Sequence, residues 1–272
     1  MNTKETDVVT NLFVTNTHTP LLFFSSDGFV YKLKTWRLPQ SGRNSKGKAI
    51  INLLPINSSA RITTILPVDA EEETWKDLQI FFATSTGNVR KNALSDFTNV
   101  KANGKIAMKL PENTTLVGAQ ICKNDNDVLL TTAEGKAIRF NTEDVRIFKG
   151  RDSIGVKGIT LKKNDTVISM AVLKHVEVNT EERLAYFKMR RAITGEDNGI
   201  ENGEDSTLVL SQERYVELGA LEEWILTITS QGYGKRSSAH EYRRSGRGGQ
   251  GITSANLERR RDSIIASFTV ED

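Results

Sequence analysis

Apolar residues along the chain gather in short runs, and four of these runs share one layout around a glycine. Two adjacent apolar residues come first, a hydroxyl residue stands three positions before the glycine, and a base stands four positions after it. The pairs with their glycines are Leu21–Leu22 with Gly28, Ile80–Phe81 with Gly87, Val128–Leu129 with Gly135, and Ile225–Leu226 with Gly232. Each block predicts a β-hairpin, because glycine adopts the positive φ that a tight turn requires.

The turn glycines lie 59, 48 and 97 residues apart, which indicates one period of roughly 50 residues with a last gap of about two periods. Such a repeat predicts stacked supersecondary units. A second glycine follows each turn and predicts a second hairpin-like half in every unit. These glycines are Gly47, Gly104, Gly158 and Gly251. About four strands per unit match a propeller blade, so we predict an all-β, propeller-like disc of four-stranded blades.

We assign the whole chain, residues 1–272, to one domain. It consists of a strand from a preceding blade in residues 1–20, repeats at 21–68, 80–122, 128–174 and 225–270, and an insertion at 175–224. The last apolar strand, Ile264–Val270, would ordinarily lead to another repeat. We therefore expect a fragment that forms an incomplete disc of four or five blades with exposed strand edges.

The insertion is acidic and partly helical. Residues 177–223 contain twelve acidic and five basic residues, so the rest of the chain carries a net charge of +10 against +3 for the whole. Asn179 followed by Glu182 resembles a capping box and predicts a helix through Ala192. A second helix is predicted for residues 211–218, ended by Gly219, with a disordered acidic stretch at residues 195–206.

The bases fall in two columns. The first lies on the strand after each turn and comprises Lys32, Lys34, Arg90, Lys91, Arg139, Lys235 and Arg236. The second lies around the second glycines and comprises Arg43, Lys46, Lys48, Lys101, Lys105, Arg151, Lys157, Arg243, Arg244 and Arg247.

Alternation predicts that Tyr31 and Leu33 face inward while Lys32 and Lys34 face water. In the adjacent pairs Arg90–Lys91 and Lys235–Arg236, at least one base of each should lie at an edge or extend outward. Repetition places equivalent residues at equivalent positions, so the columns predict a basic rim suited to a polyanion such as DNA. The alternative is that these charges serve solubility alone.

Other patterns argue against catalysis in this chain. The single cysteine, Cys122, excludes a disulfide framework and suits a buried thiol in a reducing cytoplasm. The three histidines show no metal-ligand spacing, and the glycines 246, 248 and 251 match a dinucleotide fingerprint without the strand and helix that it needs. With no long apolar stretch and a polar start, we expect a soluble intracellular protein.

Four segments of the chain carry a family resemblance. They are Phe13–His18, Gly28–Lys32, Ile50–Pro55 and Gly232–Arg236. Together they closely resemble the C-terminal domain of the A subunit of bacterial DNA gyrase, a type IIA DNA topoisomerase, over nearly the whole chain except the insertion.

The resemblance implies a β-pinwheel around whose rim duplex DNA wraps, which supports ATP-dependent negative supercoiling by an A2B2 holoenzyme in the bacterial cytoplasm. It also implies no catalytic residue and no cofactor in this chain, because ATP and Mg²⁺ act through the cleavage core and the B subunit. Arg214–Tyr215 has the dipeptide of the family's cleavage site, but it lies in the acidic insertion.

The family's Gln-Arg-Arg-Gly-Gly-Lys-Gly box is absent, and the nearest match is residues 244–251, with Gln250 at the lysine position. A basic, glycine-rich loop of this kind brings backbone N–H groups and arginines close to phosphates.

Two alternative functions stay open. One is that of the equivalent domain of topoisomerase IV, which binds DNA without strong wrapping, and the other is that of a propeller that serves as a protein-interaction platform.

Overall fold

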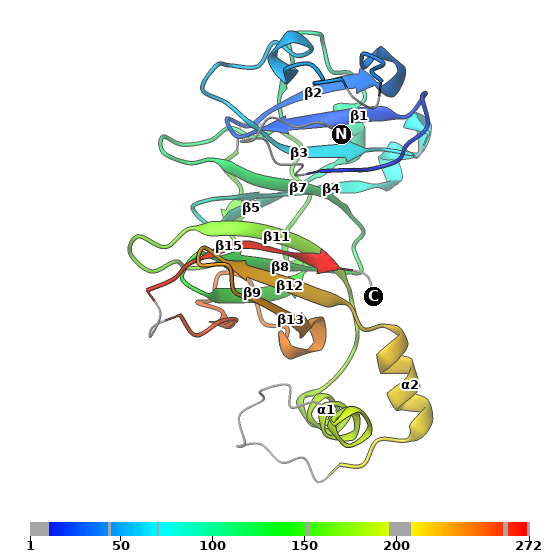
Figure 1. Ribbon diagram of the computed structural model, residues 1–272, viewed down its shortest axis with the longest axis vertical. Coiled ribbons are helices and arrows are strands. Elements are labelled where there is room, and N and C mark those ends of the chain that lie inside the picture. Colours follow the sequence, from blue (N-terminus) through cyan, green and yellow to red (C-terminus); the bar gives the residue numbers. More distant parts are fainter. Residues whose placement is uncertain are drawn as a thin grey trace. The chain divides into compact units, whose positions relative to one another are not determined.

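The computed structural model describes residues 11–42, 45–69, 71–150, 153–195, 208–257 and 261–270. Contacts between Cα atoms divide the chain into two compact units. The first comprises Met1–Ser85, Val89–Ile121 and Ile147–Val156, and the second comprises Thr86–Asn88, Cys122–Arg146 and Lys157–Asp272. Each unit is built mainly from antiparallel sheets, so the predicted all-β class is confirmed (Figure 1).

Two sheets have most of their strands in the first unit. The first sheet has the order β3-β1-β2-β6, with β1 Pro20–Ser25, β2 Phe29–Lys34, β3 Ile62–Pro67 and β6 Lys105–Ile106. The second has the order β10-β5-β4-β7, with β4 Gln79–Thr84, β5 Asn88–Ala93, β7 Leu116–Cys122 and β10 Val156–Lys157.

Two further sheets lie in the second unit. The third sheet has the order β11-β8-β9-β14, with β8 Asn126–Thr132, β9 Lys136–Asn141, β11 Val167–Lys174 and β14 Ile252–Thr253. The fourth has the order β13-β12-β15, with β12 Trp224–Thr229, β13 Gly234–Ser238 and β15 Ile264–Val270. Short 3-10 turns connect the strands: η1 Thr35–Arg37, η2 Ile50–Asn52, η3 Glu72–Asp77, η4 Leu94–Phe97, η5 Thr142–Asp144 and η6 Ala239–Glu241.

The four predicted hairpins are β1–β2, β4–β5, β8–β9 and β12–β13, and their pairing confirms the prediction. The turn glycine has a φ between 83° and 86° in all four. Side chains other than glycine rarely adopt this conformation, so the glycine of each block is required by the turn itself.

The fourth strand of a sheet comes from the following repeat. The two-residue strands β6 and β14 pair with β2 and β9, and β10 lies beside β5 in the same way. Our prediction that each repeat supplies its own second hairpin was therefore wrong. A two-residue strand shows no periodicity in the sequence, and its partner lies in another repeat.

The glycine before each exchanged strand allows a close approach between backbones. A Cβ atom built at Gly251 would lie 2.4 Å from the carbonyl oxygen of Ala137. In the third repeat the glycine with this role is Gly155, at a φ of 84°, rather than the predicted Gly158. We call the residues that precede Gly104, Gly155 and Gly251 and the short strands after them the exchange loops, and we include the equivalent residues around Gly47 of the first repeat.

Both faces of the first strand are buried in the first three hairpins, whereas β12 of the fourth alternates between buried and half-buried residues. In β1, Leu21 and Phe23 pack into one cluster with Tyr31, whereas Leu22 and Phe24 pack into another. Phe24 contacts the rings of Phe82 and Phe97 edge to face, with centroids 5.6 and 6.1 Å apart. The predicted alternation between core and water was therefore wrong, because the face assigned to water is also covered.

The insertion contains the predicted helices, α1 Thr180–Thr194 and α2 Gln212–Ala220 (Figure 1). The capping box is present: Glu182 N donates to Asn179 Oδ1 at 2.9 Å, and Asn179 N donates to Glu182 Oε2 at 3.1 Å. The helix α2 includes Gly219 and ends one residue later, so its predicted end was too early. Most of the stretch predicted to be disordered, residues 196–206, lies outside the described residues.

The start of the chain differs from the prediction. Residues 11–19 contain no strand, and β1 begins at Pro20, while residues 1–10 lie outside the described ranges. Cys122 is buried as a free thiol, as predicted. No helix in the described part of the chain is long and apolar enough to cross a membrane.

Candidate nucleic-acid interface

The first column of bases does not form an exposed row. Arg90 is 0% exposed, Lys91 2% and Arg139 6%, and the side chain of Lys32 is mostly buried. The predictions that Lys32 faces water and that one base of the Arg90–Lys91 pair extends outward were wrong. A base buried to this extent contacts no phosphate while the surrounding structure stays folded.

Arg139 is held by an ion pair and by main-chain carbonyls. Its Nε donates to Asp127 Oδ2 at 2.8 Å, and its two terminal nitrogens donate to the carbonyls of Ala239 at 2.8 Å and Lys174 at 3.1 Å. Asp127 is 1% exposed, and His175 Nδ1 lies 3.2 Å from its carboxylate. Burying this charge is tolerated because it is both paired and hydrogen-bonded.

Arg90 and Lys32 make the same kind of contact. Arg90 donates to the carbonyls of Gly150 and Ser153, the latter at 2.8 Å, and to Asn92 Oδ1 at 2.8 Å. Lys32 Nζ donates to the carbonyl of Thr98 at 2.8 Å and to Glu72 at 2.7 Å, and lies 5.0 Å from the Trp75 ring centroid. These strand bases therefore hold the following repeat in place.

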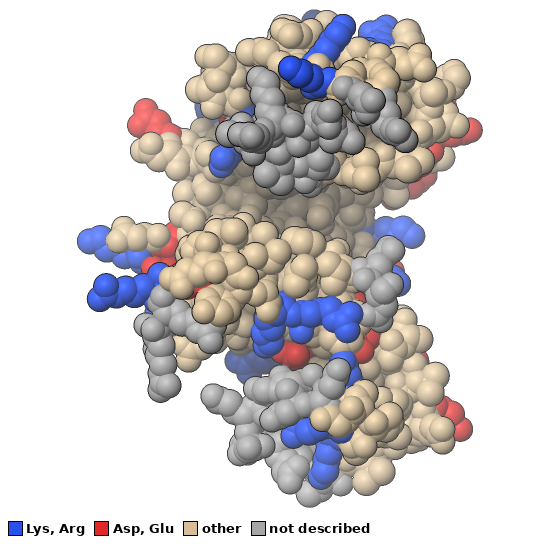
Figure 2. Space-filling view, in the orientation of Figure 1, with Lys and Arg blue, Asp and Glu red and all other residues tan. Residues whose placement is uncertain are grey.

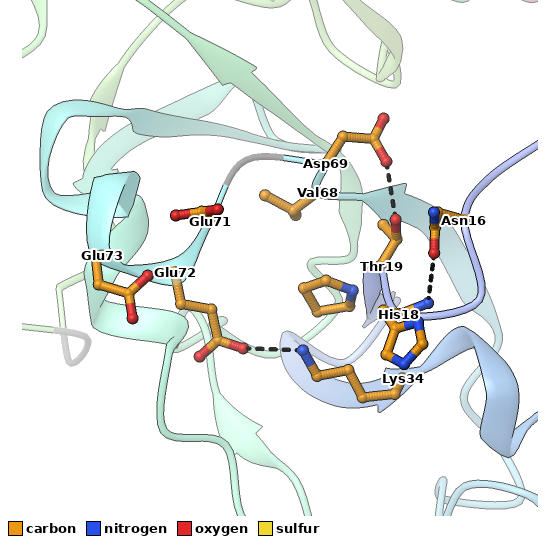
Figure 3. Close-up of a pocket in the computed structure, with 10 residues that line it drawn as sticks. Asn16, His18, Thr19, Lys34, Val68, Asp69, Glu71, Glu72 and Glu73 are labelled. Carbon is orange, nitrogen blue, oxygen red and sulfur yellow. Dashed lines mark hydrogen bonds and ion pairs between the residues drawn. The ribbon is translucent and has the colours of Figure 1, made fainter.

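Lys34 points toward a pocket of about 650 Å³ in the first unit (Figure 3). Its Nζ lies 3.7 Å from Glu72, and the carboxylates of Asp69, Glu71 and Glu73 also line the pocket. Asp69 accepts a hydrogen bond from Thr19 Oγ1 at 3.0 Å. The excess of carboxylates disfavours a phosphate here, so Lys34 is a poor candidate for DNA contact.

In the fourth repeat the strand bases are exposed. Lys235 lies 3.5 Å from Glu241, and Arg236 lies 4.4 Å from the Trp224 ring centroid. Arg190 of α1 lies at the same distance from that ring and pairs with Glu222 at 2.8 Å. Trp224 thus links the insertion to the exposed base of β13.

The second column is the exposed one. Its exposed members are Lys46, Lys48, Lys101, Lys157, Arg243, Arg244 and Arg247. Lys105 is half-buried and donates to the carbonyls of Asp96 at 2.5 Å and Asn99 at 3.3 Å. Arg43 and Arg151 lie outside the described residues. The sequence reasoning missed Arg146 and Lys149, which are exposed in the same loop of the third repeat.

The glycine-rich loop at residues 244–251 is anchored on segments of the third repeat. Arg247 donates to the carbonyls of Asp144 at 2.9 Å and Lys157 at 3.0 Å, and Gly248 N donates to Gly158 O at 2.6 Å. Thr160 Oγ1 donates to Gly248 O at 2.7 Å. The loop leads into β14 rather than into a helix, so it is not a dinucleotide-binding turn.

Acidic residues lie beside one base of this loop. Arg244 lies 3.2 Å from His175 Nε2 and lines a cleft of about 700 Å³ together with Glu177, Glu182 and Glu217 of the insertion. On the face shown in Figure 2, Lys and Arg side chains stand in separate groups, divided by uncharged surface and some carboxylates.

Arg214 and Tyr215, the dipeptide that matches the family's cleavage site, have a structural role. Tyr215 packs on Tyr186 with ring centroids 5.2 Å apart, and Arg214 pairs with Glu182 at 3.1 Å and Glu217 at 2.9 Å, so this dipeptide belongs to the packing of the insertion. Within the described residues, no group of three or more His, Cys, Asp or Glu side chains is arranged to hold a metal ion.

A model of the DNA gyrase C-terminal domain, a β-propeller family, matches residues 19–69, 79–123, 126–174 and 223–271. The chain belongs to this family. The four matched stretches carry the four hairpins, and the insertion lies between the third and the fourth.

Relatives agree with membership in the gyrase C-terminal domain family. The DNA gyrase A subunit of Granulibacter bethesdensis is 45% identical over 96% of this chain, and that of Rickettsia bellii is 40% identical over all of it. The chain spans 29% and 30% of the length of these proteins.

The solved C-terminal domain of DNA topoisomerase IV matches 95% of this chain and 65% of its own, with a TM-score of 0.68 at 20% identity. The E. coli ParC C-terminal domain matches 95% of this chain and 84% of its own, with a TM-score of 0.58 at 15% identity. These likenesses concern the fold alone.

Proposed function

We propose that this chain is a DNA-binding part of the gyrase A protein and that duplex DNA lies against the exposed bases of its exchange loops. Family membership and the exposure of these bases support the proposal, and the second of these observations carries it. A flexible base in an exposed loop neutralises a phosphate without a specific contact to a DNA base. We therefore expect affinity that depends strongly on salt and little on sequence.

We further propose that the bound DNA is bent. Wrapping requires such a bend, and wrapping in turn would support ATP-dependent negative supercoiling. Bending a site of 20–30 base pairs by 40–90° costs about 1–6 kcal/mol, which several phosphate contacts can offset. The remainder of the gyrase A protein, together with the gyrase B protein, would supply cleavage and ATP hydrolysis, with Mg²⁺, in the bacterial cytoplasm. The 40–45% identity to gyrase A proteins favours this role over that of a topoisomerase IV domain.

A salt titration tests the DNA contact. Binding of a labelled duplex is measured for the chain, for a Lys46→Ala/Lys48→Ala variant and for a Lys162→Ala/Lys163→Ala variant. All four lysines are exposed, but only the first pair lies in an exchange loop. Loss of two phosphate contacts should reduce the slope of log affinity against log salt by about 2, while the control pair should leave it unchanged.

The proposed contact fails if both variants bind like the parent chain. Binding of a protein partner that is insensitive to the loop lysines would favour an interaction platform instead. Wrapping has its own test, because ligation of relaxed plasmid in the presence of the chain shifts the linking number only when the bound DNA is bent with a defined hand. Tight binding without such a shift would leave DNA binding standing and refute wrapping.

A further inference from the structure

One histidine connects the third sheet to the glycine-rich loop. The side chain of His175, directly after β11, is 20% exposed, and its Nδ1 lies 3.2 Å from both carboxylate oxygens of Asp127. Arg244 Nη1 of the loop lies 3.2 Å from His175 Nε2 and 3.5 Å from Nδ1. The ring therefore links the buried pair of Asp127 and Arg139 to an exposed base of the loop.

The partners of the ring determine its protonation state. A carboxylate that is paired with an arginine only accepts hydrogen bonds, and a guanidinium only donates them. We therefore assign the ring proton to Nδ1, which faces Asp127, and the lone pair to Nε2, which is the ring nitrogen closer to Arg244. A second proton, on Nε2, would remove this acceptor and bring two positive charges together. The contact with Arg244 thus belongs to the neutral ring of His175.

The main chain beside Arg244 is fixed independently of the histidine. Arg244 and Arg139 form a parallel β-bridge, and Ser245 N donates to Arg139 O at 2.8 Å. Arg244 itself is exposed. Loss of the contact with the ring would therefore move the Arg244 side chain and leave the path of the loop unchanged.

Charges of both signs face the ring. Asp127 lies on β8, Arg139 on β9 and Arg244 in the glycine-rich loop, and Lys174 N, one residue before the ring, donates to Glu223 at 2.7 Å. The insertion adds the charged residues that line the same cleft, which are Glu177, Glu182, Arg214 and Glu217. A charged ring is attracted by Asp127 and repelled by Arg244. A second proton therefore strengthens one contact of the ring and breaks the other.

We propose that His175 is a positioning residue for Arg244: the neutral ring holds the guanidinium at the cleft of the insertion, and protonation of the ring frees it to contact a DNA phosphate. The inference rests on the proposed contact between the exchange loops and DNA. A freed Arg244 neutralises one further phosphate, so DNA binding becomes stronger and more dependent on salt as the pH falls.

Salt titrations of DNA binding at about pH 5.5 and pH 8 test the proposal, because histidine ordinarily changes its charge in this range. In the parent chain the slope of log affinity against log salt should be steeper by about 1 at the lower pH. His175→Gln, which has no charge to gain, should show the same slope at both pH values. His175→Lys, which is charged throughout, should show the steeper slope at both. The matched control is His18→Gln at another exposed histidine, which should keep the difference seen in the parent.

NMR spectroscopy without DNA tests the position of Arg244 directly. At pH 8 the ring nitrogens of His175 should show the proton on Nδ1, and carbon-13 relaxation should show an ordered Arg244 side chain. At pH 5.5 this side chain should be mobile. These measurements use the parent chain, so they decide the proposal even where a variant proves unstable in thermal unfolding.

The two measurements separate this inference from the proposed function. A parent chain that binds no DNA at either pH would refute the DNA contact, while the NMR data would still decide whether His175 holds Arg244. An Arg244 side chain that is equally ordered at both pH values would overturn the inference. The same pH dependence of DNA binding in the parent chain and in His175→Gln would also overturn it, with DNA binding itself left standing.

Discussion

Strand bases in three repeats donate hydrogen bonds to main-chain carbonyls of the repeat that follows. Lys32 bonds to Thr98, Arg90 to Ser153 and Arg139 to Ala239, at 2.8 Å in each case. A long cationic side chain suits this role, because it crosses a packed sheet face and brings several hydrogen-bond donors to main-chain carbonyls. The recurrence of bases on these strands is therefore explained by folding rather than by DNA contact.

Replacement of Arg139 should destabilise the fold. Arg139→Met leaves Asp127, which is 1% exposed, without the guanidinium that pairs with it, and it removes the hydrogen bonds that Arg139 donates to the carbonyls of Ala239 and Lys174. We expect the free energy of unfolding to fall by about 3–5 kcal/mol, as for other buried ion pairs with one partner removed. Urea denaturation measures this change. The matched control is Lys157→Met at an exposed site, expected within about 0.5 kcal/mol of the parent.

His240 makes the free energy of unfolding depend on pH. Its Nε2 donates to Leu218 O at 3.0 Å, and its buried Nδ1 has no hydrogen-bond partner in the described structure. Burial lowers the pKa of His240 below its usual 6.5 despite the nearby carboxylates of Glu222 and Glu223, and the charge of Arg139 lowers it further. The unfolded chain therefore binds a proton more readily, so this contribution is complete above pH 6.5 and is lost as the pH falls below it.

The variant His240→Gln, which keeps an N–H donor, isolates this effect. Unfolding free energies measured at pH 7.5, 6.5 and 5.5 should decline more steeply for the parent chain than for the variant. Burial raises the pKa of Glu241, which works in the opposite direction, because its contribution is lost as the pH rises above 4.5. Glu241 is present in both proteins, so their difference reports on His240. Parallel pH profiles would contradict this account.

Among the structural elements, the sequence predicts the turns and caps that depend only on neighbouring residues. The turn glycines Gly28 and Gly135 and the cap at Asn179 act within a few residues of their own position, and all three were found as predicted. The exchanged strands were missed because each has two residues and pairs with a different repeat. The burial of Lys91 was missed because alternation identifies the two faces of a strand but not what covers each of them.

The capping box of α1 offers a test of an element that the sequence identified. In Asn179→Ala the side-chain oxygen that accepts from Glu182 N is lost, which should cost about 0.5–2 kcal/mol of stability. Asn179→Asp retains an acceptor and should stay close to the parent. Thermal unfolding followed by circular dichroism compares the three proteins. Equal losses in both variants would show that the amide group, rather than its oxygen, is required.

In the whole molecule, the insertion and the repeats carry net charges of opposite sign. Residues 177–223 carry seven more acidic than basic residues, while the rest of the chain has a net charge of +10. The cleft that Arg244 lines brings Glu177 and Glu217 close to a base of the glycine-rich loop. If DNA lies along this loop, as we propose, these carboxylates repel its phosphates and weaken binding at low salt.

Neutralising the two carboxylates should therefore strengthen binding. Glu177→Gln/Glu217→Gln is expected to raise the affinity for duplex DNA about two- to fivefold at low salt, with the gain disappearing at high salt as the charges are screened. Glu213→Gln is the control, because Glu213 is an exposed residue of the same insertion that does not line the cleft. Fluorescence anisotropy at both salt concentrations measures the change. An unchanged affinity at low salt would show that the insertion does not compete with DNA for the loop, and an equal gain in Glu213→Gln would assign the effect to net charge rather than to the cleft.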